Sequence, residues 1–174
     1  MHYAWETTAY RDVTMHETDQ GHSPRHTVAL ELQAQAQRAR KALLIVLATE
    51  SPATAIAELD HAVEALARIE ALASQHDFVD LPMLDDVGSS VDRLACELYH
   101  QGACDDLDAK ALTAFIDRHA RGLTALEGIG PASARKLFAH GISNLEQLRA
   151  LDPTALDEVE GLGNATLARI KANL

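Results

Sequence analysis

The chain has 174 residues, of which 47% are hydrophobic and only 4% aromatic, and its formal net charge is −11 at pH 7. It contains no apolar run of about eighteen residues and no basic, apolar leader, which argues against a membrane span and a secretory signal. Its two cysteines are too few for a disulfide framework, so we expect a reduced, cytoplasmic protein (nucleoid-associated if prokaryotic) with no membrane partner.

The first 22 residues form an N-terminal arm in our interpretation. They are polar, lack a helical period and carry three aromatic residues, Tyr3, Trp5 and Tyr10. We expect an extended or loose segment that packs an aromatic side chain or two on the helices that follow.

Residues 23–121 are predicted to form an acidic four-helix bundle. Alanine and leucine dominate, and apolar residues recur at helical spacing. The pairs Ser23-Pro24 and Ser51-Pro52 read as a serine N-cap followed by proline at the first helical position. The helices are expected at Pro24–Thr49, Pro52–Gln75, Ser89–Gln101 and Asp106–Arg121, with a broken stretch from His76 to Asp86.

Two patterns in these helices resemble metal sites. Glu58-x-x-His61 and Glu97-x-x-His100 are similar to the paired Glu-x-x-His motifs of di-iron bundles, but at 100° per residue they face away from the apolar stripes. Bundle ligands must face inward, so we do not predict a di-iron site.

A zinc site is the second metal alternative. Cys96, His100 and Cys104 are spaced four apart and could bind zinc, but Gly102 should end the helix before Cys104. Ordinary buried thiols are favoured, and we predict neither a metal nor a cofactor. No nucleophile elbow, P-loop or nuclease carboxylate set is visible, so we expect no enzymatic activity.

The C-terminal third contains an internal repeat at an offset of 33 residues. Each copy reads apolar-Glu-Gly-apolar-Gly and then continues as a helix. Leu123, Leu126, Glu127, Gly128, Gly130, Ala132, Ser133, Lys136 and Leu137 recur as Leu156, Val159, Glu160, Gly161, Gly163, Ala165, Thr166, Arg169 and Ile170.

The spacing of each repeat suits a tight hairpin between two helices. Both glycines are expected to permit positive φ, and the apolar residue between them (Ile129 or Leu162) should point into the core. The next helix then begins with free N–H groups that suit a phosphate oxygen. Pro131 fits the first position of that helix, and His140-Gly141-Ile142 should end it at a glycine.

This pattern resembles the tandem helix-hairpin-helix family over about 52 residues, and we place that domain at 122–174. The resemblance implies sequence-independent binding of duplex DNA across the minor groove. The contacting backbone would be Gly128 to Gly130 and Gly161 to Gly163. The full set of candidate DNA-binding residues is Gly128, Ile129, Gly130, Ala132, Lys136, Gly161, Leu162, Gly163, Ala165, Arg169 and Lys171.

Charge limits what this resemblance implies. Residues 1–122 hold ten Lys or Arg against twenty Asp or Glu, whereas residues 123–174 hold five against six. Ala132 and Ala165 stand where many DNA-binding members carry Lys or Arg, so binding should be weak and salt-sensitive. The cluster Arg38, Arg40 and Lys41 could extend a DNA-binding surface, but a solvated helix face is favoured.

The sequence therefore predicts an all-α protein, a helical bundle followed by a tandem helix-hairpin-helix domain. Our leading hypothesis is an accessory duplex-DNA-binding protein of repair, recombination or genome maintenance. The alternative is an adaptor in which the acidic bundle and the helix-hairpin-helix domain bind partner proteins. A protein partner on the bundle and a homodimer are both left open.

Overall fold

A computed structural model describes residues 23–152 and 154–173; the N-terminal arm and Pro153 lie outside the described residues. The described chain contains helices and no strand, which confirms the all-α prediction. The helices are α1 (Pro24–Ala48), α2 (Pro52–Gln75), α3 (Leu84–His100), α4 (Ala109–His119), η1 (Arg121–Ala125), α5 (Pro131–Ala139), α6 (Leu145–Ala150), η2 (Ala155–Glu158) and α7 (Asn164–Asn173). No described helix combines the length and the apolarity needed to cross a membrane.

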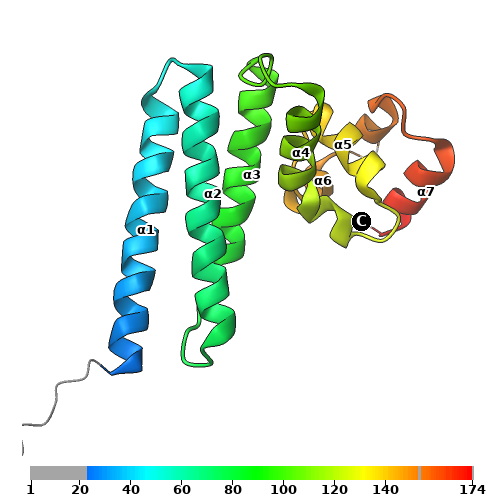
Figure 1. The fold of residues 1–174 in the computed structure, drawn as a ribbon. Coiled ribbons are helices and arrows are strands. Elements are labelled where there is room, and N and C mark those ends of the chain that lie inside the picture. Colours follow the sequence, from blue (N-terminus) through cyan, green and yellow to red (C-terminus); the bar gives the residue numbers. More distant parts are fainter. Residues whose placement is uncertain (1–22, 153, 174) are drawn as a thin grey trace, which may run out of the picture.

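The three long helices lie side by side in a row, and the shorter helices gather beyond α3 (Figure 1). α1 packs mainly on α2, α2 on α3, and α3 on both α4 and α5. Helix α1 thus stands at the edge of the row, and α4 lies between the long helices and the C-terminal segment.

The first two helices confirm the predicted boundaries to within one residue. Ser51 caps α2, its side chain accepting a hydrogen bond from the Thr54 N–H at 3.3 Å. The Ser23 side chain makes no such bond. The proline after Ser23 therefore contributes more than the serine to the start of α1, because its φ already suits a helix.

The third and fourth helices begin elsewhere than predicted. Helix α3 starts at Leu84, five residues early, because Asp85 and Asp86 lie in its first turn and interact favourably with the helix dipole. Helix α4 starts at Ala109, because the carboxylate of Asp108 accepts from the Ala111 N–H at 2.8 Å and caps it.

A continuous hydrophobic core joins the long helices to the C-terminal segment. It extends from Val46 in α1 to Ile170 in α7. The ring of Phe138 in α5 is fully buried, 5.7 Å from Tyr99 in α3 and 6.4 Å from Phe115 in α4 between centroids. The C-terminal helices therefore share their core with α3 and α4.

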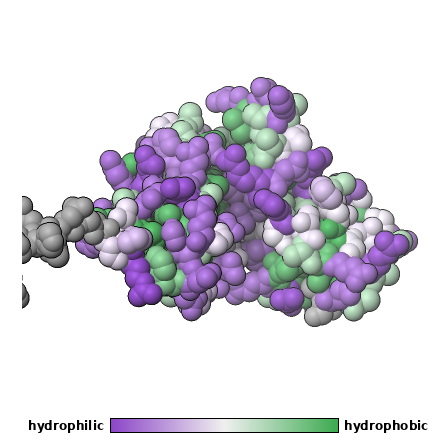
Figure 2. All heavy atoms as spheres, turned by 60° about the horizontal axis from the view of Figure 1, so that its bottom comes forward, coloured by the Kyte–Doolittle hydropathy of each residue, from purple (hydrophilic) through white to green (hydrophobic). Residues whose placement is uncertain are grey.

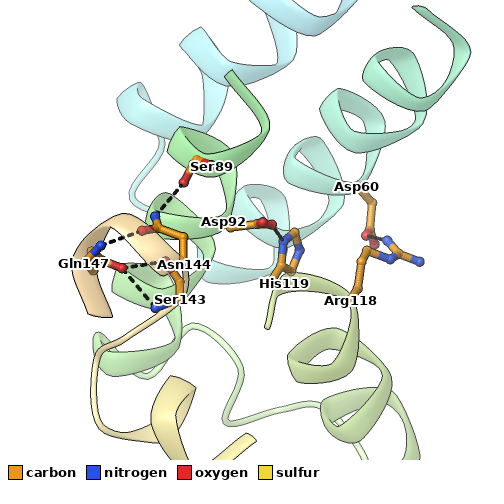
Figure 3. A network of polar contacts seen from close by, with 8 residues as sticks. All are labelled: Asp60, Ser89, Asp92, Arg118, His119, Ser143, Asn144 and Gln147. Carbon is orange, nitrogen blue, oxygen red and sulfur yellow. Dashed lines mark hydrogen bonds and ion pairs between the residues drawn. The ribbon is translucent and has the colours of Figure 1, made fainter. Parts of the chain in front are cut away.

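Two sets of part-buried polar contacts lie at the same junction (Figure 3). Asn144, the N-cap of α6, accepts from the Gln147 N–H at 2.9 Å and donates from Nδ2 to the Ser89 carbonyl of α3 at 3.3 Å. Beside it, His119 at the end of α4 is fully buried, with Nδ1 2.9 Å from the Asp92 carboxylate of α3. The Asn144 and His119 Nδ1 contacts join α6 and α4 to α3, whereas His119 Nε2 is buried without a hydrogen-bond partner among the described residues.

Candidate nucleic-acid interface

The first repeat folds as a hairpin between η1 and α5. The Ile129 N–H donates to the Leu126 carbonyl at 3.1 Å, and the Ile129 side chain is buried, as predicted. Gly128 adopts φ +95°, a left-handed conformation that only glycine reaches without strain. Gly130 then caps α5 in extended conformation, with φ −89°.

The second repeat reproduces this geometry between η2 and α7. The Leu162 N–H lies 3.4 Å from the Val159 carbonyl, and the Leu162 side chain is buried. Gly161 adopts φ +78°, and α7 begins directly after Gly163. The short helix α6 links the two hairpins and is held by its Asn144 cap.

The second glycine of each pair differs from the prediction. We expected both glycines to use positive φ, but Gly130 and Gly163 do not. A Cβ atom at either position would meet no heavy atom within 4 Å. The fold itself does not require glycine there, and the absent side chain leaves the backbone open to close approach from outside.

Each hairpin is covered by a long side chain from the other repeat. The Lys136 ammonium donates to the Gly161 carbonyl, and its Cε would lie 3.2 Å from a Cβ at Gly161. Arg169 lies on the first hairpin, where its Cβ would be 2.9 Å from a Cβ at Gly128. Lys136 and Arg169 are equivalent positions of the repeat, so each repeat places the same residue on the hairpin of the other.

The first side chains of α5 and of α7 are exposed to solvent. Pro131 and Ala132 are exposed at the first, and Asn164 and Ala165 at the second. N–H groups in a first helical turn lack an intrahelical partner and carry the positive end of the helix dipole. Both helix starts are therefore suited to an anionic oxygen, although neither alanine adds a charge.

Carboxylates neutralise two of the five C-terminal cations. Lys171 Nζ lies 2.7 Å from the Asp157 carboxylate, which makes this predicted DNA-binding cation part of an ion pair. Arg135 binds Asp117 of α4 through two hydrogen bonds of 2.5 and 2.7 Å. These hydrogen bonds lower the pKa of Asp117 and raise that of Arg135. Glu127 and Glu160 are exposed beside the hairpins and add local negative charge.

The basic cluster of α1 does not extend this surface. Arg38, Arg40 and Lys41 are exposed on α1, at the opposite end of the helix row from α5 and α7 (Figure 1). Any contact between the two hairpins and DNA would leave these three cations far from the same phosphates.

The three residues of the zinc pattern differ in burial, whereas the Glu58 carboxylate and His61 Nδ1 of the other pattern lie 3.5 Å apart. Cys96 and Cys104 are buried whereas His100 is exposed, and burial raises the pKa of the Cys96 thiol to about 11. The Cys96 thiol lies 3.3 Å from the Phe138 carbonyl, as expected of a core thiol. Across residues 23–152 and 154–173, no three His, Cys, Asp or Glu side chains are grouped as a metal site would require.

Sequence reasoning missed the residues that orient the hairpins. The motif Ser143-Asn144-x-x-Gln147 is a capping pattern, and it could have indicated both α6 and the Gln147 Oε1 contacts to Ser143. The pair formed by buried His119 and half-buried Asp92 carries no comparable signal, because the two residues are 27 positions apart.

Comparison with known proteins agrees with this geometry over the C-terminal third. No solved structure matches the chain. Residues 120–174 match a sequence model of the SAM-like helix-hairpin-helix tandem family, and this segment is therefore a tandem helix-hairpin-helix domain of the kind that binds nucleic acids or proteins.

Proposed function

We propose that the protein binds duplex DNA without sequence preference, through the Gly128–Gly130 and Gly161–Gly163 hairpins. The observation that carries the proposal is the pair of open second glycines. Gly130 and Gly163 each precede an exposed helix start, and neither position needs glycine for packing or backbone conformation. Two such helix starts at equivalent repeat positions suit two phosphates.

Lys136 and Arg169 are the cations that would contact phosphates in this proposal. After donating one hydrogen bond to Gly161, the Lys136 ammonium retains two further donors beside the second hairpin. Arg169 occupies the equivalent position over the first hairpin. Each hairpin would thus hold a phosphate with its own backbone and a cation from the other repeat.

The charge balance makes the proposed binding weak. Lys171 and Arg135 are engaged by carboxylates, and Ala132 and Ala165 supply no charge. With about two phosphates neutralised, affinity should fall on the order of tenfold between 50 and 200 mM salt. A role as an accessory factor in repair, recombination or genome maintenance, without catalysis of its own, fits weak binding of this kind.

A titration of the intact chain against a fluorescently labelled duplex, followed by anisotropy at these two salt concentrations, tests the proposal. We expect binding at low salt, the stated salt dependence, and equal affinity for unrelated sequences. Lys136→Ala should reduce the salt slope by about one phosphate equivalent. Absence of binding at low salt would overturn the proposal.

The second candidate function is a protein-binding adaptor, and the same surface supports it. Two uncharged alanines beside exposed Glu127 and Glu160 suit a protein ligand better than they suit a polyanion. The salt titration separates the candidates, because an adaptor without DNA affinity gives no anisotropy change at either concentration.

A further inference from the structure

An apolar groove lies where α1 meets α2 and the segment leading into α3. It has a volume of about 750 Å³ and is lined by leucines of α1, by Leu66 and Ile69 of α2, and by residues 80–84 and Val87. Figure 2 shows the molecule with the lower end of Figure 1 turned towards the reader. In this view hydrophobic residues of the long helices are exposed between hydrophilic ones.

The groove concentrates the exposed hydrophobic surface of the molecule. Leu44 and Leu47 of α1 are 55% and 70% exposed, and Met83 is 70% exposed. With Leu81, they make up four of the six large exposed hydrophobic side chains found in residues 23–152 and 154–173. Clustered apolar exposure of this kind marks a binding surface.

Helix α1, which forms one wall of this groove, is basic. It carries four Lys or Arg and one acid, in a chain with a net charge of −11. The single acid, Glu31, is paired with Arg68 of α2 at 2.6 Å. Of these cations Arg40 lines the groove, whose opposite wall includes Asp80, whereas Arg38 and Lys41 are outside the lining. Arg40 makes no ion pair with a described residue.

The N-terminal arm has the complementary chemistry. Residues 1–22 carry four acids against one arginine, and they hold three of the seven aromatic residues of the chain, including its single tryptophan, Trp5. The arm joins α1 at Ser23. The 18 residues from Trp5 to Ser23 can span up to about 60 Å, whereas Leu44 lies about 32 Å along the helix from Ser23.

We propose that the groove beside α1 is the docking site of the chain's own N-terminal arm, with aromatic side chains in the groove and an acid facing Arg40. Covalent attachment gives the arm a millimolar effective concentration, which an untethered ligand of equal affinity must exceed. A second copy of the chain is a poorer occupant, because symmetric docking by this face would bring two basic α1 helices together.

The fluorescence of Trp5 tests the proposal in the intact chain, since no other tryptophan contributes. We expect blue-shifted emission and protection from acrylamide quenching. Leu44→Glu in the groove should shift the emission to that of solvated tryptophan and remove the protection. Leu30→Glu is the matched control, because Leu30 lies on the same helix, is 51% exposed and is outside the groove lining.

Three results would overturn the proposal. The first is solvent-like emission from the unmodified chain, and the second is an equal response to Leu44→Glu and Leu30→Glu. The third is blue-shifted emission that reverts on dilution together with a dimer in sedimentation velocity, because the groove would then be filled by another copy. Circular dichroism of each variant verifies that the helices are retained.

Discussion

At the scale of single residues, the two glycines of each hairpin have different functions. Gly128 and Gly161 are required by the fold, because both have positive φ and a side chain from the other repeat lies against them. Gly130 and Gly163 have ordinary φ and open surroundings. The glycine pattern of the sequence predicted the hairpins but could not separate these two functions.

The first prediction separates them by stability. Gly128→Ala should lower the free energy of unfolding by at least about 1–2 kcal/mol, the usual cost of a left-handed alanine, and more if Arg169 cannot move. Gly130→Ala should leave it nearly unchanged. Urea unfolding followed by circular dichroism measures both variants, and equal losses would contradict the assignment.

The cysteines give a second prediction at this scale. Cys96 and Cys104 are buried, and burial raises the pKa of both thiols, to about 11 for Cys96. Because the thiolate is the reactive species, a thiol-specific reagent at pH 8 should label the folded protein slowly. Labelling should become rapid in denaturant. Rapid labelling of both cysteines in the folded protein would show that neither is a core thiol.

At the scale of elements, helical periodicity and capping residues were the signals that predicted where helices begin and end. They were sufficient to predict the bounds of α1 and α2, each of which begins at the proline of a serine-proline pair. They failed at the start of α3, which was expected at Ser89, whereas the helix begins at Leu84 and passes through Gly88 and Ser89. They also did not reveal that Lys136 reaches the other hairpin, because such a contact depends on how α5 packs against the second repeat.

Helix α6 has only six residues and depends on its cap, which yields a third prediction. Asn144→Ala should cost about 0.5–2 kcal/mol for the lost cap, with a further loss because the bond to the Ser89 carbonyl also disappears. Asn144→Ser keeps a capping oxygen and loses only the second contact, so it should be less destabilised. Thermal unfolding compares the three proteins, and a serine variant as unstable as the alanine variant would exclude a capping function.

The ion pair between α4 and α5 gives a fourth prediction, which concerns pH. Arg135 lowers the pKa of Asp117 below its ordinary value of 3.8, so the folded state favours the charged carboxylate. The pair therefore stabilises the fold above that ordinary value, and the benefit disappears as pH falls through the lowered pKa. The difference in Tm between wild type and Asp117→Asn should be constant near neutrality and vanish in acid. A Tm difference that grows in acid would contradict a lowered pKa for Asp117.

At the scale of the whole molecule, charge and apolar surface are segregated along the helix row. The hairpins lie at one end with a nearly balanced charge, and basic α1 lies at the other beside its groove (Figure 1). The sequence predicted the uneven distribution of acid. It could not predict the groove, because that surface forms only when α1, α2 and the segment before α3 come together.

The central claim is that the open glycine hairpins bind the DNA backbone, and the double variant Gly130→Leu, Gly163→Leu tests it most directly. A Cβ at either position would meet no heavy atom within 4 Å, so the fold should persist while the leucine side chains block the approach to each helix start. Gly88→Leu in α3, also at an open position, is the matched control. We predict that duplex binding at low salt is lost in the double variant and retained in the control; undiminished binding by the folded double variant would contradict the claim.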